Sequence, residues 1–238
     1  MKKIIGFYHI AMMNNWLDVV SDQITKLEKS GLLAASDHLE VTALGPHQQL
    51  KKLHLPEKCI VHHKDNFKSF EHVTLERIRN MSQRDDFFCY YFHTKGVSVP
   101  NHSAQHYNIP EKVEQYGLTP FHKVLANVRR WRMLMDYFII EKWHTALSAL
   151  DNHDCVGVNW ETTPFRHFAG NYWWSKSQYL NTLESVNALN CGIFKTEEET
   201  RRHQAEAWIG QRDDVKIKSL YQGTANYWEA PAPKTYRN

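Results

Sequence analysis

The chain has 238 residues, of which 42% are hydrophobic and 23% charged, and its formal net charge is +3. A chain of this length buries roughly 70–75% of its unfolded surface without a disulfide or a metal, and a charged fraction near the average of about 25% argues against disorder. Lysine and arginine are spread over both halves, and no apolar run approaches the roughly 18 residues of a membrane span, so we expect no nucleic-acid partner and no transmembrane segment.

The four cysteines, Cys59, Cys89, Cys155 and Cys191, are far apart in the sequence. None belongs to a Cys-x-x-Cys motif, so free thiols in a reducing compartment are expected. The sequence thus favours a cytoplasmic protein.

The first 93 residues alternate between apolar, β-prone segments and helical patterns. Strands are predicted at 3–12, 39–45, 58–64 and 86–93, and helices at 15–30, 47–55 and 71–83. This alternation predicts an α/β domain with a mainly parallel central sheet flanked by helices. In open sheets of this kind ligands bind beyond the carboxyl ends of the strands, which here carry His9, Asp65 and the segment from His93 to Gly96.

The second half predicts fewer strands and more helix. Residues 97–120 contain three prolines and are expected to form a surface loop. The predicted elements that follow are a long helix from 124 to 150, a strand at 155–160, a strand and turn at 165–174, helices at 175–183 and 196–209, and a strand at 215–221. Thr196 and Glu199 form a capping box at the start of the last helix. The tail from 226 to 238 has weak order signals.

The segment His93-Thr94-Lys95-Gly96 ends the most aromatic of the predicted strands. A lysine ammonium is a compact charge suited to phosphate, and glycine lets a ligand approach the backbone closely. A solvated turn is the alternative interpretation.

Aromatic and polar side chains are most concentrated in the segment from Arg166 to Trp174, Arg-His-Phe-Ala-Gly-Asn-Tyr-Trp-Trp. Aromatic faces stack on the apolar faces of sugars, while His, Asn and Arg bond to hydroxyl groups. The segment therefore suits a carbohydrate or another planar polar ligand. An aromatic corner of the core is the alternative.

Six blocks occur in order along the chain: residues 91–98 (Tyr-Phe-His-Thr-Lys-Gly-Val-Ser), 131–132 (Trp-Arg), 135–138 (Met-Asp-Tyr-Phe), 156–160 (Val-Gly-Val-Asn-Trp), 167–174 (His-Phe-Ala-Gly-Asn-Tyr-Trp-Trp) and 206–209 (Glu-Ala-Trp-Ile). Together they resemble a group of bacterial and large-virus glycosyltransferases with a GT-A-type fold, relatives of an algal-virus rhamnosyltransferase domain. The resemblance spans roughly residues 3–221.

The resemblance implies one GT-A-like domain that transfers a sugar from a nucleotide-sugar, with a UDP-sugar favoured, to a glycan acceptor hydroxyl in surface polysaccharide or glycoconjugate synthesis. Residues 1–98 would bind the nucleotide, 121–221 the acceptor, and 222–238 would form a tail. Peripheral attachment to a membrane is compatible with such a role. The nucleotide-sugar-binding residues it implies are His9, Asp65, His93, Thr94, Lys95 and Gly96. The acceptor-binding residues it implies are Asn159, Trp160, His167, Gly170, Asn171, Trp173 and Trp174.

An inverting transfer needs a base that deprotonates the acceptor hydroxyl. The resemblance points to Glu206, in the Glu-Ala-Trp-Ile block, and Glu161 is the second candidate. The alternative for Glu206 is an exposed helix carboxylate paired with Arg202 at i,i+4.

One departure from the GT-A pattern concerns the metal. Enzymes of this fold commonly bind a divalent cation through an Asp-x-Asp motif, and this sequence contains none. The expected position carries His93-Thr94-Lys95, so we hypothesise that Lys95 neutralises the departing diphosphate. A metal held by His93 and a carboxylate elsewhere is the rival, and metal dependence stays open.

Two other classes of function compete with this one. A carbohydrate-binding protein without catalysis would use the same aromatic segment. A metal-dependent hydrolase would draw on the 15 histidines, but His62-His63 and the others lack the spacing of a zinc site.

Overall fold

A computed structural model of the chain describes residues 2–98, 121–192 and 196–237. One seven-stranded sheet lies at its centre, with the strand order β3-β2-β1-β4-β8-β5-β9. The strands are β1 (Lys3–Ala11), β2 (His38–Leu44), β3 (Cys59–Lys64), β4 (Phe87–His93), β5 (Cys155–Gly157), β8 (Trp173–Lys176) and β9 (Ile217–Ser219). Only β8 runs antiparallel to its neighbours. This architecture confirms the α/β class with a mainly parallel sheet.

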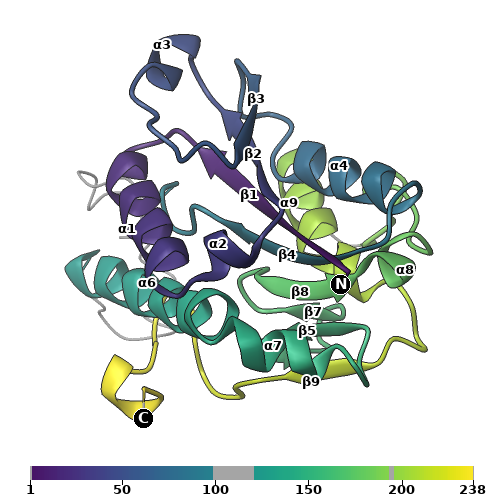
Figure 1. Cartoon of the computed structure of the whole chain (residues 1–238). Coiled ribbons are helices and arrows are strands. Elements are labelled where there is room, and N and C mark those ends of the chain that lie inside the picture. The colour runs from purple at the N-terminus through teal and green to yellow at the C-terminus, as the bar shows by residue number, and fades with distance from the viewer. Residues whose placement is uncertain (1, 99–120, 193–195, 238) are drawn as a thin grey trace.

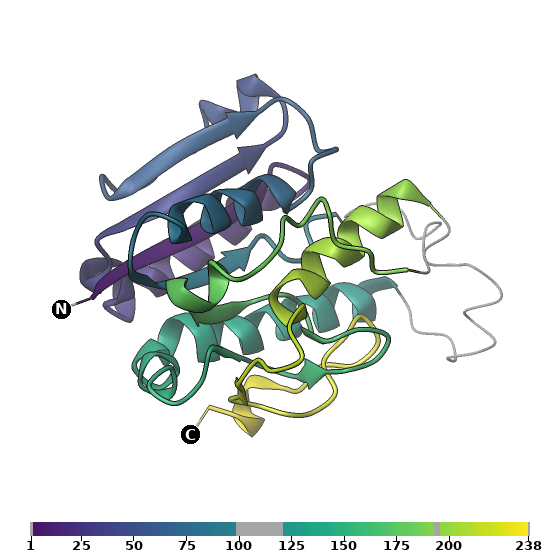
Figure 2. The ribbon, with the colours of Figure 1, turned by 90° about the vertical axis from the view of Figure 1, so that its right-hand side faces the viewer.

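Helices cover both faces of the sheet (Figure 1). One face is covered by α1 (Trp16–Lys29), α6 (Phe121–Asp136), the π-helical turn η2 (Tyr137–Glu141) and α7 (Trp143–Ala149). The other is covered by α4 (His72–Ser82), α8 (Ser177–Leu180) and α9 (Glu197–Ala207), and Figure 2 shows α4 and α9 near each other on that side. Short elements complete the fold: α2 (Leu32–Ala35), α3 (His47–Leu50), η3 (Trp208–Gly210), η4 (Pro233–Thr235) and the ribbon of β6 (Trp160–Glu161) with β7 (His167–Phe168).

The alternation of side chains along the central strands decides what reaches the site. Successive residues of a strand point to opposite faces, so Tyr8 packs under α1 while Phe7 packs on the α4 side. His9 follows on the α4 side. In β4, Tyr91 packs on that side too, and His93 comes two residues later. Parallel pairing sets His9 opposite His93. The two imidazoles therefore lie together at the carboxyl edge of the sheet, on the face that α4 and α9 cover.

The predicted elements of the first half are confirmed, with boundaries that differ by a few residues. Two predictions in the second half are wrong. The strand at 155–160 ends at Gly157, because Asn159 has a positive φ of 50° and turns the chain into the β6–β7 ribbon. The helix predicted at 175–183 begins only at Ser177, as α8, because residues 173–176 form strand β8, in which Trp173 and Trp174 point to opposite faces and are buried in separate cores.

The predicted long helix from 124 to 150 is interrupted by the π-helical turn η2 and continues as α7. The predicted loop at 97–120 lies almost entirely outside the described residues, and so does the link from residue 193 to 195. Among the residues described, no helix is both long enough and apolar enough to cross a bilayer.

Candidate functional site

The pair of histidines at the carboxyl edge is anchored from both sides. His9 Nδ1 lies 2.8 Å from the Thr74 hydroxyl on α4. His93 Nε2 lies 2.9 Å from the Gly170 carbonyl oxygen. Since a carbonyl oxygen only accepts, Nε2 of His93 carries a hydrogen and donates it. The other nitrogen of His93, Nδ1, is therefore the one that exchanges a proton, and it faces a carboxylate oxygen of Glu71 at 3.8 Å.

Glu71 lies beside His93 and directly before α4. We call His9, Glu71, His93 and Lys95, with Glu206 of α9, the histidine cluster. The Tyr91 hydroxyl donates to its Oε2 at 2.6 Å, and the Asn171 amide donates to the same oxygen at 2.7 Å. These two donors fix the carboxylate so that Oε1 is left facing His93. Glu71 is not among the site residues predicted from the sequence. The available signal was its place at the start of the predicted helix 71–83, on the same edge as the strand ends.

The electrostatics of this cluster separate the charged from the neutral groups. Burial alone would raise the pKa of Glu71, but His93, His9, the Tyr91 hydroxyl and Lys95 together lower it to about 2. Burial lowers the pKa of His9 to about 4, and it lowers the pKa of His93 although Glu71 opposes that shift. At neutral pH the cluster therefore holds an ionised Glu71 beside neutral histidines. His93 can accept a proton at Nδ1, and Glu71 would stabilise the imidazolium that results.

Lys95 extends the cluster away from the sheet. Its side chain is buried, and its ammonium lies 4.2 Å from the centroid of the Trp131 ring and 6.0 Å from that of Tyr227. The Arg132 guanidinium donates to the Lys95 carbonyl at 2.7 Å and fixes this turn. Gly96 follows with a φ of +90°, and a Cβ at this position would lie 2.1 Å from Val128. The turn that presents Lys95 therefore requires glycine.

Thr94 has a structural role in this turn. Its hydroxyl accepts from the Ala11 amide at 3.0 Å, and its own amide donates to the His9 carbonyl at 3.0 Å. It ties the end of β4 to the end of β1.

Glu206 reaches the same cluster from α9. Its side chain is 18% exposed and lies 3.9 Å from Arg202, which confirms the i,i+4 pair. The charge of Glu206 acts on His93, where it raises the pKa, and on Tyr227. Burial raises the pKa of Tyr227, but Lys95 and Arg202 lower it below its usual value overall. Arg202 donates to the Tyr227 hydroxyl at 3.0 Å. Tyr227 lies in the tail, where the sequence carried only weak order signals.

The structure buries three of the predicted acceptor-binding residues. Trp173 and Trp174 are fully buried, and their indole N–H groups donate to the Asn171 side chain at 2.9 Å and to the Ile139 carbonyl at 2.8 Å. Asn171 is buried and donates to Glu71 and, at 3.2 Å, to the Ala205 carbonyl. In this structure none of the three presents a free face to a ligand. Their burial agrees with the alternative, an aromatic corner of the core, and direct acceptor contacts by them stay a prediction.

Asn159 and Gly170, two further predicted acceptor-binding residues, have structural roles in this fold. The Asn159 side-chain oxygen accepts from the Gly223 amide at 2.9 Å and links β5 to the segment after β9. Gly170 has a φ of +87° and supplies the carbonyl that holds His93.

Trp160, Glu161 and His167 lie on the β6–β7 ribbon, beside α9. His167 Nδ1 lies 2.9 Å from the Phe165 carbonyl, and its Nε2 lies 3.9 Å from a half-exposed Glu161 carboxylate. Asp65 is 74% exposed in the turn after β3, where it accepts from the His47 amide at 3.0 Å. Since β2 separates β3 from β1, the structure does not bring Asp65 to the histidine pair.

Among the described residues, no three His, Cys, Asp or Glu side chains are grouped so that they could hold a metal ion. The predicted division into a nucleotide half and an acceptor half stays a prediction. One continuous sheet joins the two, through the pairing of β4 with β8.

Comparison with known proteins gives similarities of fold only. No protein-family model matches the chain, and no curated protein matches it. Among solved structures, the chain is similar to Rv0371c of Mycobacterium tuberculosis in complex with manganese, with 7% identity, a TM-score of 0.43 and coverage of 94% of this chain and 90% of that one. It is also similar to a 4-diphosphocytidyl-2C-methyl-D-erythritol synthase of Anaerococcus prevotii, with 8% identity, a TM-score of 0.42 and coverage of 94% and 89%. Similarity at this level assigns neither a family nor an activity.

Proposed function

We propose that the protein is a glycosyltransferase that uses a nucleotide-sugar donor and a glycan acceptor, in surface polysaccharide or glycoconjugate synthesis. The observation that supports this most is the grouping of His9, His93 and Lys95 around Glu71 at the carboxyl edge of β1 and β4, where the charge of Glu206 also raises the pKa of His93. Two of the blocks that carry the glycosyltransferase resemblance, those at 91–98 and 206–209, contribute to this one cluster.

In the proposed reaction the acceptor oxygen forms a bond to the anomeric carbon while the bond from that carbon to the donor diphosphate breaks. The electron pair of the broken bond leaves with the diphosphate, where the positive charge of Lys95 offsets the developing negative charge. The acceptor hydroxyl proton passes to a base, which we assign to Glu206. Glu71 with His93 is the adjacent proton-accepting pair, and we assign it the positioning and charge balance of the site. Glu161 stays the second candidate for the base.

The assignment of the base is tested by measuring kcat for sugar transfer by the Glu206→Gln and Glu161→Gln variants, with the same donor and acceptor. General-base catalysis contributes about 10²–10⁴-fold, so Glu206→Gln should lower kcat by at least about 10²-fold and Glu161→Gln by much less. A loss below about tenfold in Glu206→Gln rules Glu206 out as the base. The reverse ranking moves that role to Glu161.

The proposed role of Lys95 is tested by metal removal. Turnover that persists in EDTA supports a side-chain cation at the leaving diphosphate. Turnover that EDTA abolishes and Mn²⁺ restores contradicts it, since the charge would then be carried by a metal.

A further inference from the structure

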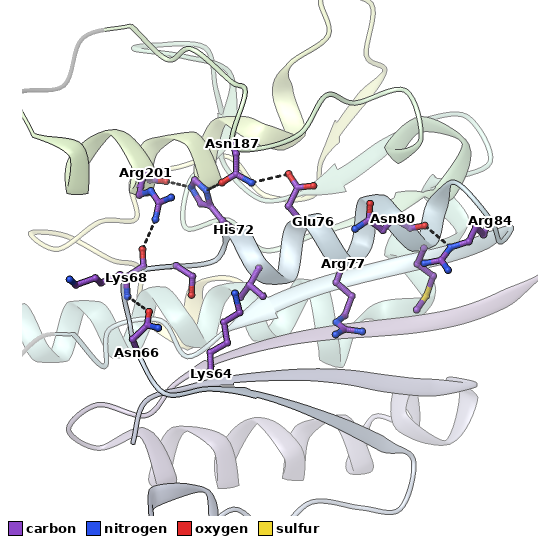
Figure 3. A pocket seen from close by; sticks show the side chains of 13 residues that line it. Lys64, Asn66, Lys68, His72, Glu76, Arg77, Asn80, Arg84, Asn187 and Arg201 are labelled. Carbon is purple, nitrogen blue, oxygen red and sulfur yellow. Dashed lines mark hydrogen bonds between the residues drawn. The ribbon is translucent and has the colours of Figure 1, made fainter. Parts of the chain in front are cut away.

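A cavity of about 620 Å³ lies apart from the histidine cluster, between the end of β3, α4 and α9 (Figure 3). We call it the α4 groove. Its walls are side chains from four places: the end of β3 and the turn after it, the exposed side of α4, Asn187 between α8 and α9, and Arg201 of α9. Lys95 does not line it.

The α4 groove is strongly cationic. The basic side chains that line it are Lys64, Lys68, Arg77, Arg84 and Arg201. Of the lining residues, only Glu76 is acidic, and its carboxylate already accepts from the Ser185 hydroxyl at 2.5 Å and the Val186 amide at 2.7 Å. The formal charge of this one groove therefore exceeds the +3 of the whole chain.

Contacts within the protein compensate only part of this positive charge, since Arg201 lies 3.9 Å from the exposed Glu197 carboxylate and Arg77 lies near Glu40. Within the part of the chain that the structure describes, the ammonium groups of Lys64 and Lys68 have no carboxylate partner. Arg77 lies 3.6 Å from the Glu40 carboxylate, which His62 also contacts at 2.6 Å. The Nε of Arg77 and the hydroxyl of Ser69 are buried without a hydrogen-bond partner there. Buried donors of this kind cost free energy unless a ligand satisfies them.

The distribution of charge along the groove indicates an elongated ligand. Lys68 and Arg201 lie near the start of α4 and Arg84 near its end, as Figure 3 shows. α4 has 11 residues, and at 1.5 Å per residue it is about 16 Å long. A single phosphate cannot contact both ends of such a groove.

We propose that the α4 groove binds an extended anion that carries several phosphate groups. Lysine and arginine are the side chains that bind phosphate oxygens by charge-assisted hydrogen bonds. The hollow between two helices and a strand fits a chain that enters it, in contrast to the flat surface of a bilayer. This inference does not rest on the proposed glycosyltransferase activity.

The experiment titrates the full chain by calorimetry with inorganic tripolyphosphate and, separately, with inorganic phosphate. The test variant is Lys64→Ser with Lys68→Ser, which removes two exposed cations from the groove. The matched control is Lys51→Ser with Lys52→Ser, which removes two exposed lysines outside it. All titrations are repeated in a Lys95→Met background, which removes the cation of the proposed donor site, and vesicles of phosphatidylglycerol complete the set.

We expect tripolyphosphate to bind at least about tenfold more tightly than phosphate, and the test variant to lose at least about tenfold in affinity, because each lost charge-assisted bond is worth that much. The control variant should stay within about twofold, and the difference between the test and control variants should persist in the Lys95→Met background. Equal losses in test and control variants would show diffuse attraction to a basic protein and overturn the proposal. If the test and control variants no longer differ in the Lys95→Met background, the anion binds at the histidine cluster. Binding of vesicles without binding of tripolyphosphate would identify a membrane surface instead. Either outcome overturns the proposal.

Discussion

Asn171 is the side chain on which the geometry of the candidate site depends most. It donates to the Glu71 carboxylate at 2.7 Å and to the Ala205 carbonyl at 3.2 Å, and it accepts from the Trp173 indole at 2.9 Å. It is buried and has a φ of 58°. The informative change is Asn171→Gly, since glycine keeps the positive φ without strain and removes only the amide.

The magnitude follows from the groups that lose a partner. A buried Trp173 N–H left unsatisfied costs about 1–3 kcal/mol, and the bond to an ionised Glu71 is worth about 1.5–3 kcal/mol. Because Tyr91 still holds Glu71, the two losses are not fully additive, and we expect Asn171→Gly to lower the free energy of unfolding by about 3 kcal/mol. The assay is urea unfolding at pH 7. The matched control is Asn14→Gly, an exposed asparagine that also has a positive φ, of 49°, and donates only to the Val97 carbonyl.

A second variant gives this prediction a pH signature. Asn171→Asp keeps an acceptor for Trp173 and tolerates the positive φ, but places a carboxylate beside Glu71. Two carboxylates at this distance share one proton, so one pKa is strongly raised. The loss in free energy of unfolding that Asn171→Asp causes, relative to the unmodified protein, should therefore be largest at pH 7 and shrink as the pH falls towards 5. A loss below about 1 kcal/mol in Asn171→Gly, close to that of the control, or a deficit of Asn171→Asp that is the same at both pH values, would refute the role given to Asn171.

Three further predictions concern the elements that support the cluster. The pKa of His9 is about 4 in the folded protein against its ordinary value of 6.5. As the pH falls, the unfolded chain therefore binds the proton first, and the contribution of His9 to the free energy of unfolding should fall by about 2 kcal/mol between pH 7.5 and pH 5. In denaturant titrations His9→Gln should flatten the dependence of stability on pH, and an unchanged dependence would contradict the assignment. Gly96→Ala should destabilise by about 2 kcal/mol or more, because it combines a φ of +90° with a Cβ placed 2.1 Å from Val128, and Val128→Ala should recover only the steric part in a double-mutant cycle. Asp136→Ala should cost about 2–3 kcal/mol, since it removes the buried carboxylate 2.8 Å from the Lys26 ammonium and leaves only the exposed Asp22, at 2.6 Å, as its partner. Lys26→Met with Asp136→Leu should recover most of that loss in thermal unfolding.

The sequence predicted the fold where a single rule decided the outcome. The strands up to β4 follow from apolar, β-prone runs separated by helical patterns, and the strand-end argument placed His9 and His93 at one edge without reference to any motif. The errors occurred where tertiary packing competes with local pattern. The helix predicted at 175–183 begins two residues late, because the strand that buries Trp173 and Trp174 in separate cores continues to Lys176.

The site was predictable only in part, for a related reason. Density of aromatic residues near His167 suits a sugar cleft and a core corner equally, and the accessible surface that separates the two is a property of the folded chain. Glu71 and Tyr227 were missed because one is a single carboxylate before a helix and the other lies in the weakly patterned tail. Only the packing of α4 and α9 brings these side chains to the end of β4.

The central claim is that the histidine cluster, with Lys95, binds a nucleotide-sugar donor and releases its sugar. The most direct measurement is a panel of nucleotide-sugars scored by thermal shift and by donor hydrolysis, for the unmodified protein and for Lys95→Met, each with and without EDTA. One donor should raise the melting temperature, because a ligand that binds only the folded state stabilises it, and it should be hydrolysed by the unmodified protein while Lys95→Met loses both responses. A panel in which no nucleotide-sugar shifts the melting temperature or is hydrolysed, or in which Lys95→Met responds as the unmodified protein does, would contradict the account.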